Sequence, residues 1–320
     1  MSARPELSVI VTVVSGAESV RRALTALCPD GRSPKGVEIL VPIEKGLDDV
    51  AVLGVEFDDV QFSDLGVLPL TVQESGPFQE HERYDLRRSA GLLLAEGAVI
   101  AVIEDHGTPA TDFCAAVLTA HQRLPHPAIG GTVTNLVPRA MNDALWLCDF
   151  GRYAPPRAEG PSPTLTDVCV SYKREALLPI RHVFAERFHE PELHGALAAD
   201  GRVLWLDPKI TVGEERPWRP IRHRVAERFA WGRLYGELRS QGWGGFRRFF
   251  RAATSAVLVP PVLLFRALRI AGGRISFGRI AAALPALALL TIIWGLGEGF
   301  GTLFPTSGGQ NHGGNAPGPK

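Results

Sequence analysis

The sequence predicts an α/β protein built on a doubly wound, mostly parallel sheet, followed by a basic, aromatic segment and a membrane helix. Short β-branched apolar segments alternate with segments of helical spacing through the first 215 residues. Residues 216–279 carry many arginines and few carboxylates. Residues 280–297 are 18 uncharged residues in a row, which is near the lower limit for crossing the hydrocarbon core of a bilayer.

The predicted strands share a short apolar sequence bounded by turn residues, and the predicted helices share an apolar face at three- and four-residue spacing. The strands are expected at 7–14, 37–41, 67–72, 98–103, 128–134, 166–171 and 203–206. The helices are expected at 19–28, 85–95, 112–123 and 191–200. Between them, residues 150–165 are rich in proline and glycine and predict a mobile loop over the site.

Composition excludes some classes of protein and favours a reducing compartment. The 320 residues have a formal net charge of zero, so charge gives no argument for binding nucleic acid. The four cysteines form no CxxC pair, which argues against a zinc site and a disulfide framework. Residues 1–14 show no signal-peptide pattern. We therefore expect the folded part to stay in the cytosol.

The sequence VIEDHGTP (102–109) places three polar side chains at the end of a predicted buried strand. Glu104, Asp105 and His106 follow the apolar residues and precede a glycine and a proline. Ligands of parallel α/β sheets bind beyond the carboxyl ends of strands, so these side chains are candidates for a ligand site. The alternative is an ordinary solvated turn or helix cap.

Several stretches together resemble the nucleotide-binding half of family-2 glycosyltransferases with the GT-A fold. These are LSVIVTVV, VEILVPIE and ESGPFQEHERYDLRRSAGLLLAEGAVIAVIEDH, with weaker likeness in IGGTVTN and DVCVSYKREAL. Such enzymes have an acidic end to the second strand, an Arg-Asn-x-Gly helix start and a strand ending in Asp-x-Asp. The corresponding residues here are Glu44, Arg88-Ser89-Ala90-Gly91 and Glu104-Asp105-His106.

The resemblance implies a nucleotide-sugar site and a divalent metal. Glu44, Arg88, Glu104 and Asp105 would bind the nucleotide-sugar, and Glu104, Asp105 and His106 would hold Mn²⁺ or Mg²⁺. The family's Asp-x-Asp is altered to Glu-Asp-His, but carboxylate and imidazole can both ligate a divalent cation, and Mn²⁺ accepts histidine better than Mg²⁺ does.

The resemblance also implies a general base. Counting back from Gly201 through Leu193 in FHEPELHGALAADG places Glu190 at the base position, with Glu192 as the choice if the register slips. The alternative is a helix N-terminus that favours acidic residues through its dipole. The family's Gln-x-x-Arg-Trp sequence is missing, and residues 222–224 are candidates for binding phosphate instead.

The chain is expected to divide into a catalytic part and a membrane-associated part. Residues 1–215 would form the GT-A domain, with a nucleotide-sugar half (1–135) and an acceptor half (136–215). The remaining parts are a basic aromatic juxtamembrane segment (216–251), a membrane-associated region (252–304) containing a transmembrane helix at 280–297, and a disordered tail (305–320). The apolar residues 252–265 are too few for a confident span and include two prolines, so an interfacial or re-entrant segment is an equal alternative.

The resulting hypothesis is an inverting glycosyltransferase at the cytoplasmic membrane, with its catalytic domain on the cytosolic side. It would move sugar from a nucleotide-sugar to a hydroxyl of a glycan or a lipid-linked or cell-envelope acceptor, with no nucleic-acid partner. The altered metal and base motifs keep open a catalytically inactive scaffold or sugar-nucleotide sensor. A nucleotidyltransferase ranks last, because residues 14–17 provide too little of a phosphate loop.

Overall fold

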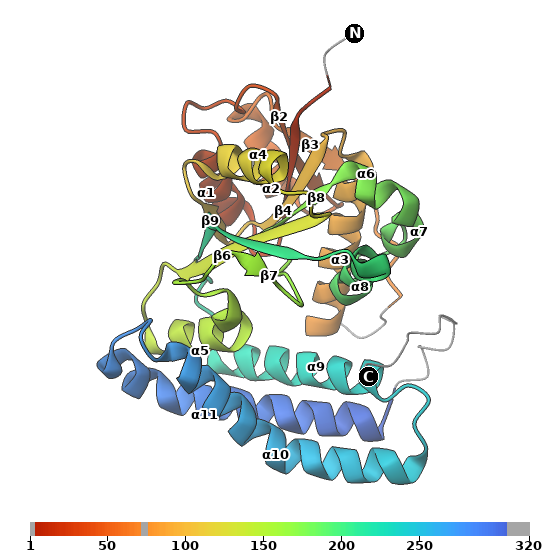
Figure 1. The fold of residues 1–320 in the computed structure, drawn as a ribbon, viewed down its shortest axis with the longest axis vertical. Coiled ribbons are helices and arrows are strands. Elements are labelled where there is room, and N and C mark those ends of the chain that lie inside the picture. The colour runs from red at the N-terminus through yellow and green to blue at the C-terminus, as the bar shows by residue number, and fades with distance from the viewer. Residues whose placement is uncertain (1–3, 72–75, 306–320) are drawn as a thin grey trace.

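A single curled sheet forms the centre of the molecule, and the long helices α9, α10 and α11 form a layer below it in Figure 1. The computed structural model describes residues 4–71 and 76–305. The strands are β1 (Leu7–Thr12), β2 (Val37–Ile43), β3 (Gln61–Asp64), β4 (Val99–Glu104), β5 (Gly107–Pro109), β6 (Ala128–Asn135), β7 (Gly160–Pro161), β8 (Val170–Lys173) and β9 (Trp205–Glu214). The helices are α1 (Ala17–Leu27), α2 (Asp48–Ala51), α3 (Pro77–Leu94), α4 (Phe113–Arg123), α5 (Ala140–Asp149), α6 (Arg174–Leu177), α7 (Arg181–Phe184), α8 (Glu190–Ala198), α9 (Ile221–Arg239), α10 (Gly245–Ala271) and α11 (Phe277–Leu303).

The strand order is β3-β2-β1-β4-β8-β6-β9-β5, with β7 beside β9. Strands β1 to β4 are parallel to one another, as are β6 and β9, whereas β8 runs antiparallel to both β4 and β6. Every residue of β1 and β4 is buried, as expected of β-branched strands with side chains packed on both faces. The prediction of an α/β fold with a mostly parallel sheet is confirmed.

Several predicted elements lie elsewhere, for identifiable reasons. The third strand is β3 at 61–64 and not at 67–72 (72–75 lie outside the described residues), because this partly exposed edge strand has a polar sequence. Helix α3 begins at Pro77, whose missing N–H costs nothing in a first turn. Strand β9 extends to Glu214 because it pairs with both β6 and β5. The residues predicted as a strand at 166–169 form a turn before β8.

The basic, aromatic segment folds as α9 and the beginning of α10, and α11 packs against both helices. Glycines of α11 allow this helix to lie close to the backbones of α9 and α10. A Cβ atom on Gly297 or Gly301 would meet the α9 backbone, and one on Gly295 or Gly299 would meet α10. Residues four apart share a helix face, so the alternating glycines of WGLGEGFG give α11 two packing faces.

Helices α10 and α11 are each long and apolar enough, by length and composition, to cross a membrane. Helix α10 continues through Pro260 and Pro261 over 27 residues, so the helix is longer than the apolar segment 252–265 and includes arginines at both of its ends. The last tail residues, 306–320, lie outside the described part of the chain.

Candidate functional site

The carboxyl ends of β1 and β4 meet, and this brings the predicted acidic motif to the loop before α1. Parallel pairing places Thr12 beside Glu104. The carboxylate Oδ2 of Asp105 then accepts N–H bonds from Val14, Ser15 and Gly16 at 3.0, 2.7 and 3.0 Å. Asp105 is fully buried and does not line the cavity described below. Its geometry favours a role in holding this loop over the predicted role in metal or nucleotide binding.

Glu104 and His106 do line the cavity, and Glu214 of β9 pairs with His106 without lining the cavity itself. His106 Nε2 lies 2.8 Å from Glu104 Oε2 and 3.2 Å from Glu214 Oε1. Glu214 reaches this position because β5 pairs antiparallel with β9, which sets Gly107 opposite Glu214. Burial opposes a charge on His106, but Glu214 and Glu104 outweigh it and raise the pKa of the imidazole well above its usual value.

The chemistry of this cluster suits a divalent cation, although its side chains are arranged as ion pairs. Among the described residues, no group of three or more His, Cys, Asp or Glu side chains is positioned as a metal site. Two carboxylates and an imidazole are nevertheless donors that Mn²⁺ accepts. Both ring nitrogens of His106 are buried without a well-aligned hydrogen bond. Glu104, His106 and Glu214 therefore fit a cation by donor type.

Arg88, on α3, connects this cluster to a carboxylate that the sequence analysis missed. Its guanidinium pairs with Glu104, lies 2.9 Å from Asp167 Oδ2 and 3.4 Å from Asp85 Oδ1. Burial alone would raise the pKa of Glu104. The nearby His106 and Arg88 outweigh the effect of burial and lower this pKa to about 2. With these carboxylates around it, Arg88 organises the acidic cluster, and the predicted contact with nucleotide stays a prediction.

Glu190 begins α8 and faces the cavity from the side of Asp167. Its Oε2 accepts the backbone N–H of Asp167 at 3.2 Å, and its Oε1 lies 3.8 Å from His194 Nδ1. Burial, and then the nearby Asp167 carboxylate, raise the pKa of Glu190 well above its usual value. The Glu192 side chain is 60% exposed and lies 3.3 Å from His189. The structure thus favours Glu190 over Glu192 as the candidate base.

Glu44 follows β2 and is buried between two arginines of α3. Its Oε1 accepts bonds from Arg83 and Arg87, and the Arg87 Nη2 distance is 2.9 Å. Its Oε2 is buried without a hydrogen-bond partner among the described residues. Glu44 does not line the cavity, so its predicted contact with the nucleotide-sugar remains a prediction.

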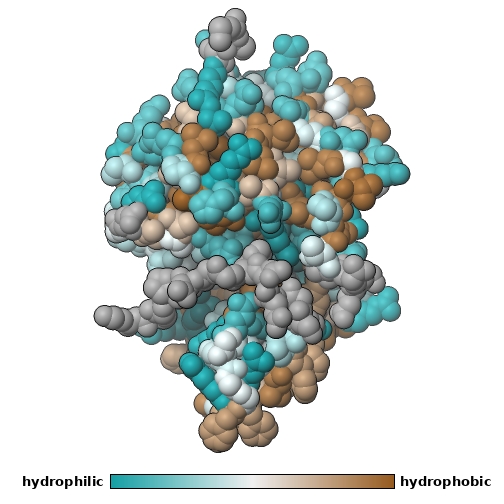
Figure 2. All heavy atoms as spheres, turned by 90° about the vertical axis from the view of Figure 1, so that its right-hand side faces the viewer, coloured by the Kyte–Doolittle hydropathy of each residue, from teal (hydrophilic) through white to brown (hydrophobic). Residues whose placement is uncertain are grey.

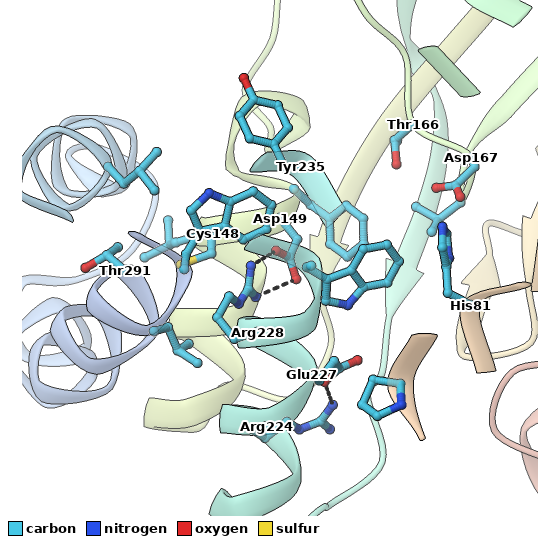
Figure 3. Close-up of a pocket in the computed structure, with 18 of the residues that line it drawn as sticks. His81, Cys148, Asp149, Thr166, Asp167, Arg224, Glu227, Arg228, Tyr235 and Thr291 are labelled. Atoms are coloured by element: carbon cyan, nitrogen blue, oxygen red, sulfur yellow. Dashed lines mark hydrogen bonds and ion pairs between the residues drawn. The ribbon is translucent and has the colours of Figure 1, made fainter. Parts of the chain in front are cut away.

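A cavity of about 850 Å³ joins the acidic cluster to the helical layer. Figure 3 shows its breadth, with His81 and Asp167 on one side and Thr291 on α11 on the other. On the wall between them, Arg228 of α9 donates to both carboxylate oxygens of Asp149, at 2.7 and 3.1 Å (Figure 3). The lining contributed by α10 and α11 includes the apolar side chains of Leu258, Val259, Val262, Leu263 and Leu290 beside polar ones such as Arg251 and Arg266.

Of the candidate phosphate-binding residues 222–224, His223 and Arg224 line this cavity, whereas Arg222 is exposed.

Two acidic residues of the site were not predicted from the sequence, although the sequence carries a weak signal for each. Asp167 precedes a strand that runs antiparallel to β4, so it lies beside the end of β4. Glu214 ends an alternating strand whose true length was underestimated.

Comparison with known proteins supports the fold. No protein-family model and no curated protein matches the sequence. Among solved structures, the chain is similar to the mannosyltransferase PcManGT from Pyrobaculum calidifontis, in complex with GDP-Man and Mn²⁺. The identity is 18% and the TM-score 0.51, over 93% of this chain and 86% of the other. A likeness to S. aureus TarS residues 1–349 has 12% identity and a TM-score of 0.44, over 89% and 90% of the chains. The chain thus shares the fold of a glycosyltransferase.

Proposed function

We propose that the chain is a metal-dependent, inverting glycosyltransferase that moves a sugar from a nucleotide-sugar to a hydroxyl of an amphiphilic acceptor. The observation that carries this proposal is the position of Glu190. It faces the same cavity as the Glu104–His106 cluster and is separated from that cluster by Arg88 and Asp167. Inversion by direct displacement needs a base on the acceptor side and charge stabilisation on the leaving-group side.

The donor is proposed to lie across the carboxyl ends of β1, β2 and β4. Glu104 and His106, supported by Glu214, would hold a divalent cation, which neutralises charge on the departing nucleotide diphosphate when it is bound. Asp105 fixes the loop of residues 14–16 through three N–H bonds, and this loop also lines the cavity. The similar fold of a mannosyltransferase that binds GDP-Man and Mn²⁺ supports this placement.

On the acceptor side, Glu190 is proposed to remove the proton from the attacking hydroxyl. The hydroxyl oxygen forms a bond to the anomeric carbon while the bond from that carbon to the diphosphate oxygen breaks. The Asp167 N–H that donates to Glu190 Oε2 holds the carboxylate in position. The raised pKa of Glu190 makes its carboxylate a stronger base than an exposed glutamate.

The acceptor is proposed to be lipid-linked, because the cavity has both polar and apolar walls. Arg224 and Arg228 of α9 line it, and so do leucines and valines of α10 and Leu290 of α11. A polar head and an apolar tail would each find a matching surface. We place the catalytic part on the cytosolic side of the cytoplasmic membrane, since the arginines of 216–279 would be attracted to the anionic lipids of the cytoplasmic leaflet.

The proposal is tested by calorimetric titration of the full chain with UDP and GDP, with and without Mn²⁺. We expect one nucleotide to bind in a Mn²⁺-dependent manner, and the Glu104→Ala and His106→Ala variants to lose that dependence. Glu192→Ala is the matched control and should bind like the unaltered chain. Binding that ignores Mn²⁺ and both variants would rule out the metal role. Nucleotide binding without any sugar transfer would support the inactive sensor instead.

A further inference from the structure

Helix α10 presents a long apolar stripe that no described element covers. Its members are each between 55% and 79% exposed and recur at helical spacing. They are Phe246, Phe249, Phe250, Val257, Leu258, Val262 and Phe265. Surface stripes of this length on soluble proteins mark interaction sites. We call this set the α10 stripe.

Helix α11 adds a second, parallel row of exposed apolar side chains. Ile292, Leu296, Phe300 and Leu303 lie three or four residues apart and are 37% to 47% exposed. In Figure 2, hydrophobic residues gather at the lower end of the molecule, where the helical layer lies. Helix α11 packs along α10, so this row lies on the helix next to the α10 stripe, and we call the two together the apolar face.

The charges beside this face have one sign. Residues 245–303 contain seven arginines and a single acidic residue, Glu298, which is buried. Arg247 and Arg269 are exposed at the two ends of α10. An apolar helix face flanked by arginines matches the boundary between acyl chains and anionic headgroups.

The packing of α11 indicates how it lies relative to a bilayer. Near its start, Arg279 Nε donates to Asp143 Oδ2 of α5 at 3.0 Å. Near its other end, Glu298 lies 3.8 Å from Arg239 of α9. These contacts are 19 residues apart, or about 28 Å along the helix, so α11 is held by α5 of the catalytic part near its start and by α9 near its other end.

A crossing helix has its two ends on opposite sides of the bilayer. If α11 crossed the bilayer, α9 would enter the hydrocarbon core with it, because α9 packs along α11. Helix α9 carries seven charged residues, and burying charged side chains in hydrocarbon costs a large amount of free energy. We therefore infer that α10 and α11 seat the protein on an anionic bilayer and lie in the plane of its interface. This inference goes beyond the proposed glycosyl transfer and does not depend on it.

In this orientation the cavity opens toward the lipid. Leu258 and Val262 belong to the α10 stripe and also line the cavity. An apolar tail could pass between bilayer and cavity without crossing water.

Vesicle co-sedimentation of the full chain tests the surface. We expect strong binding to phosphatidylcholine vesicles that contain phosphatidylglycerol, and weak binding to phosphatidylcholine alone. Phe250→Glu with Val257→Glu should weaken binding at least tenfold. Arg247→Gln and Arg269→Gln should each weaken binding to the anionic vesicles about fivefold. The control, Val55→Glu with Val67→Glu, alters apolar residues of the catalytic part that are more exposed still and should bind normally.

Equal vesicle binding by all these variants would overturn the inference. So would a vesicle-independent dimer that the Phe250→Glu and Val257→Glu changes convert to monomers, because the face would then join two copies of the chain.

Cysteine labelling separates lying in the interface from crossing the bilayer. Ser276→Cys lies between α10 and α11, Pro305→Cys follows α11, and Asp30→Cys reports the catalytic side. In sealed vesicles with the catalytic part outward, an impermeant maleimide added outside should label all three, with the four native cysteines as background. Protection of Ser276→Cys or of Pro305→Cys would show that a helix crosses and would overturn the inference.

Discussion

At the scale of single residues, Glu190 and Glu192 stand two positions apart at the start of α8, and only Glu190 faces the cavity. We expect Glu190→Gln to lower the rate of sugar transfer by about 10²–10⁴-fold, because the amide keeps the shape but cannot take the proton. Nucleotide binding should be unchanged by calorimetry. Glu192→Gln should retain nearly full activity, and the reverse pattern would assign the base to Glu192.

The pKa of Glu190 also predicts a pH dependence. Burial and Asp167 raise this pKa, and the base must be ionised, so activity should rise with pH through a range well above that of an ordinary glutamate. Asp167→Asn removes the nearby charge and should shift this rise to lower pH. The measurement is the pH profile of transfer in both proteins, with Asp58→Asn at the exposed surface as the control. An unshifted profile would contradict the coupling.

The motif Glu104-Asp105-His106 shows how far sequence reasoning reaches at this scale. Its position at the end of a strand predicted a ligand site, and two of its three residues line the cavity. The direction of each side chain was not predictable, because it depends on partners distant in the sequence. Asp105 turns toward the loop of residues 14–16, and His106 turns toward Glu214, 108 positions away.

At the scale of elements, the glycines between α9 and α11 determine how closely these helices pack. A Cβ on Gly301 would overlap the carbonyl oxygen of Arg233, so the two helix backbones would have to move apart. We expect Gly301→Ala to lower the free energy of unfolding by about 1–3 kcal/mol, measured by urea denaturation.

The matched control is Gly278→Ala, at the start of the same helix, where a Cβ would meet no atom within 4 Å. It should leave stability unchanged or raise it by up to about 1 kcal/mol. Equal losses in both variants would mean that the helix contact contributes little.

Elements with a periodic apolar pattern were predictable, and those whose form depends on tertiary partners were not. The buried strands β1, β4 and β6 lie where the sequence places them. Edge strand β3 is polar, and helix α9 is rich in charge. Helix α9 is stabilised by the packing of α3 and α11 against it.

At the scale of the whole molecule, Asp149 joins the catalytic part to the helical layer through Arg216 and Arg228. Burial raises the pKa of Asp149, but the two guanidinium groups outweigh it, so this pKa is lowered. We expect Arg228→Gln to lower the free energy of unfolding by about 1–3 kcal/mol, since it leaves the partly buried Asp149 carboxylate with one partner fewer. Calorimetric unfolding would measure this loss. Arg222→Gln, an exposed arginine of the same helix, should have no measurable effect.

By itself, the sequence determined the α/β class, the buried parallel strands, the acidic motif at a strand end and the apolar character of the last helices. These follow from local patterns of hydrophobicity and from the positions where strands end. Only the tertiary structure decided that Asp167 and Glu214 join the site, that Glu190 and not Glu192 faces it, and that α11 lies along α9. Each of these depends on contacts between residues far apart in the chain, which a local pattern does not encode.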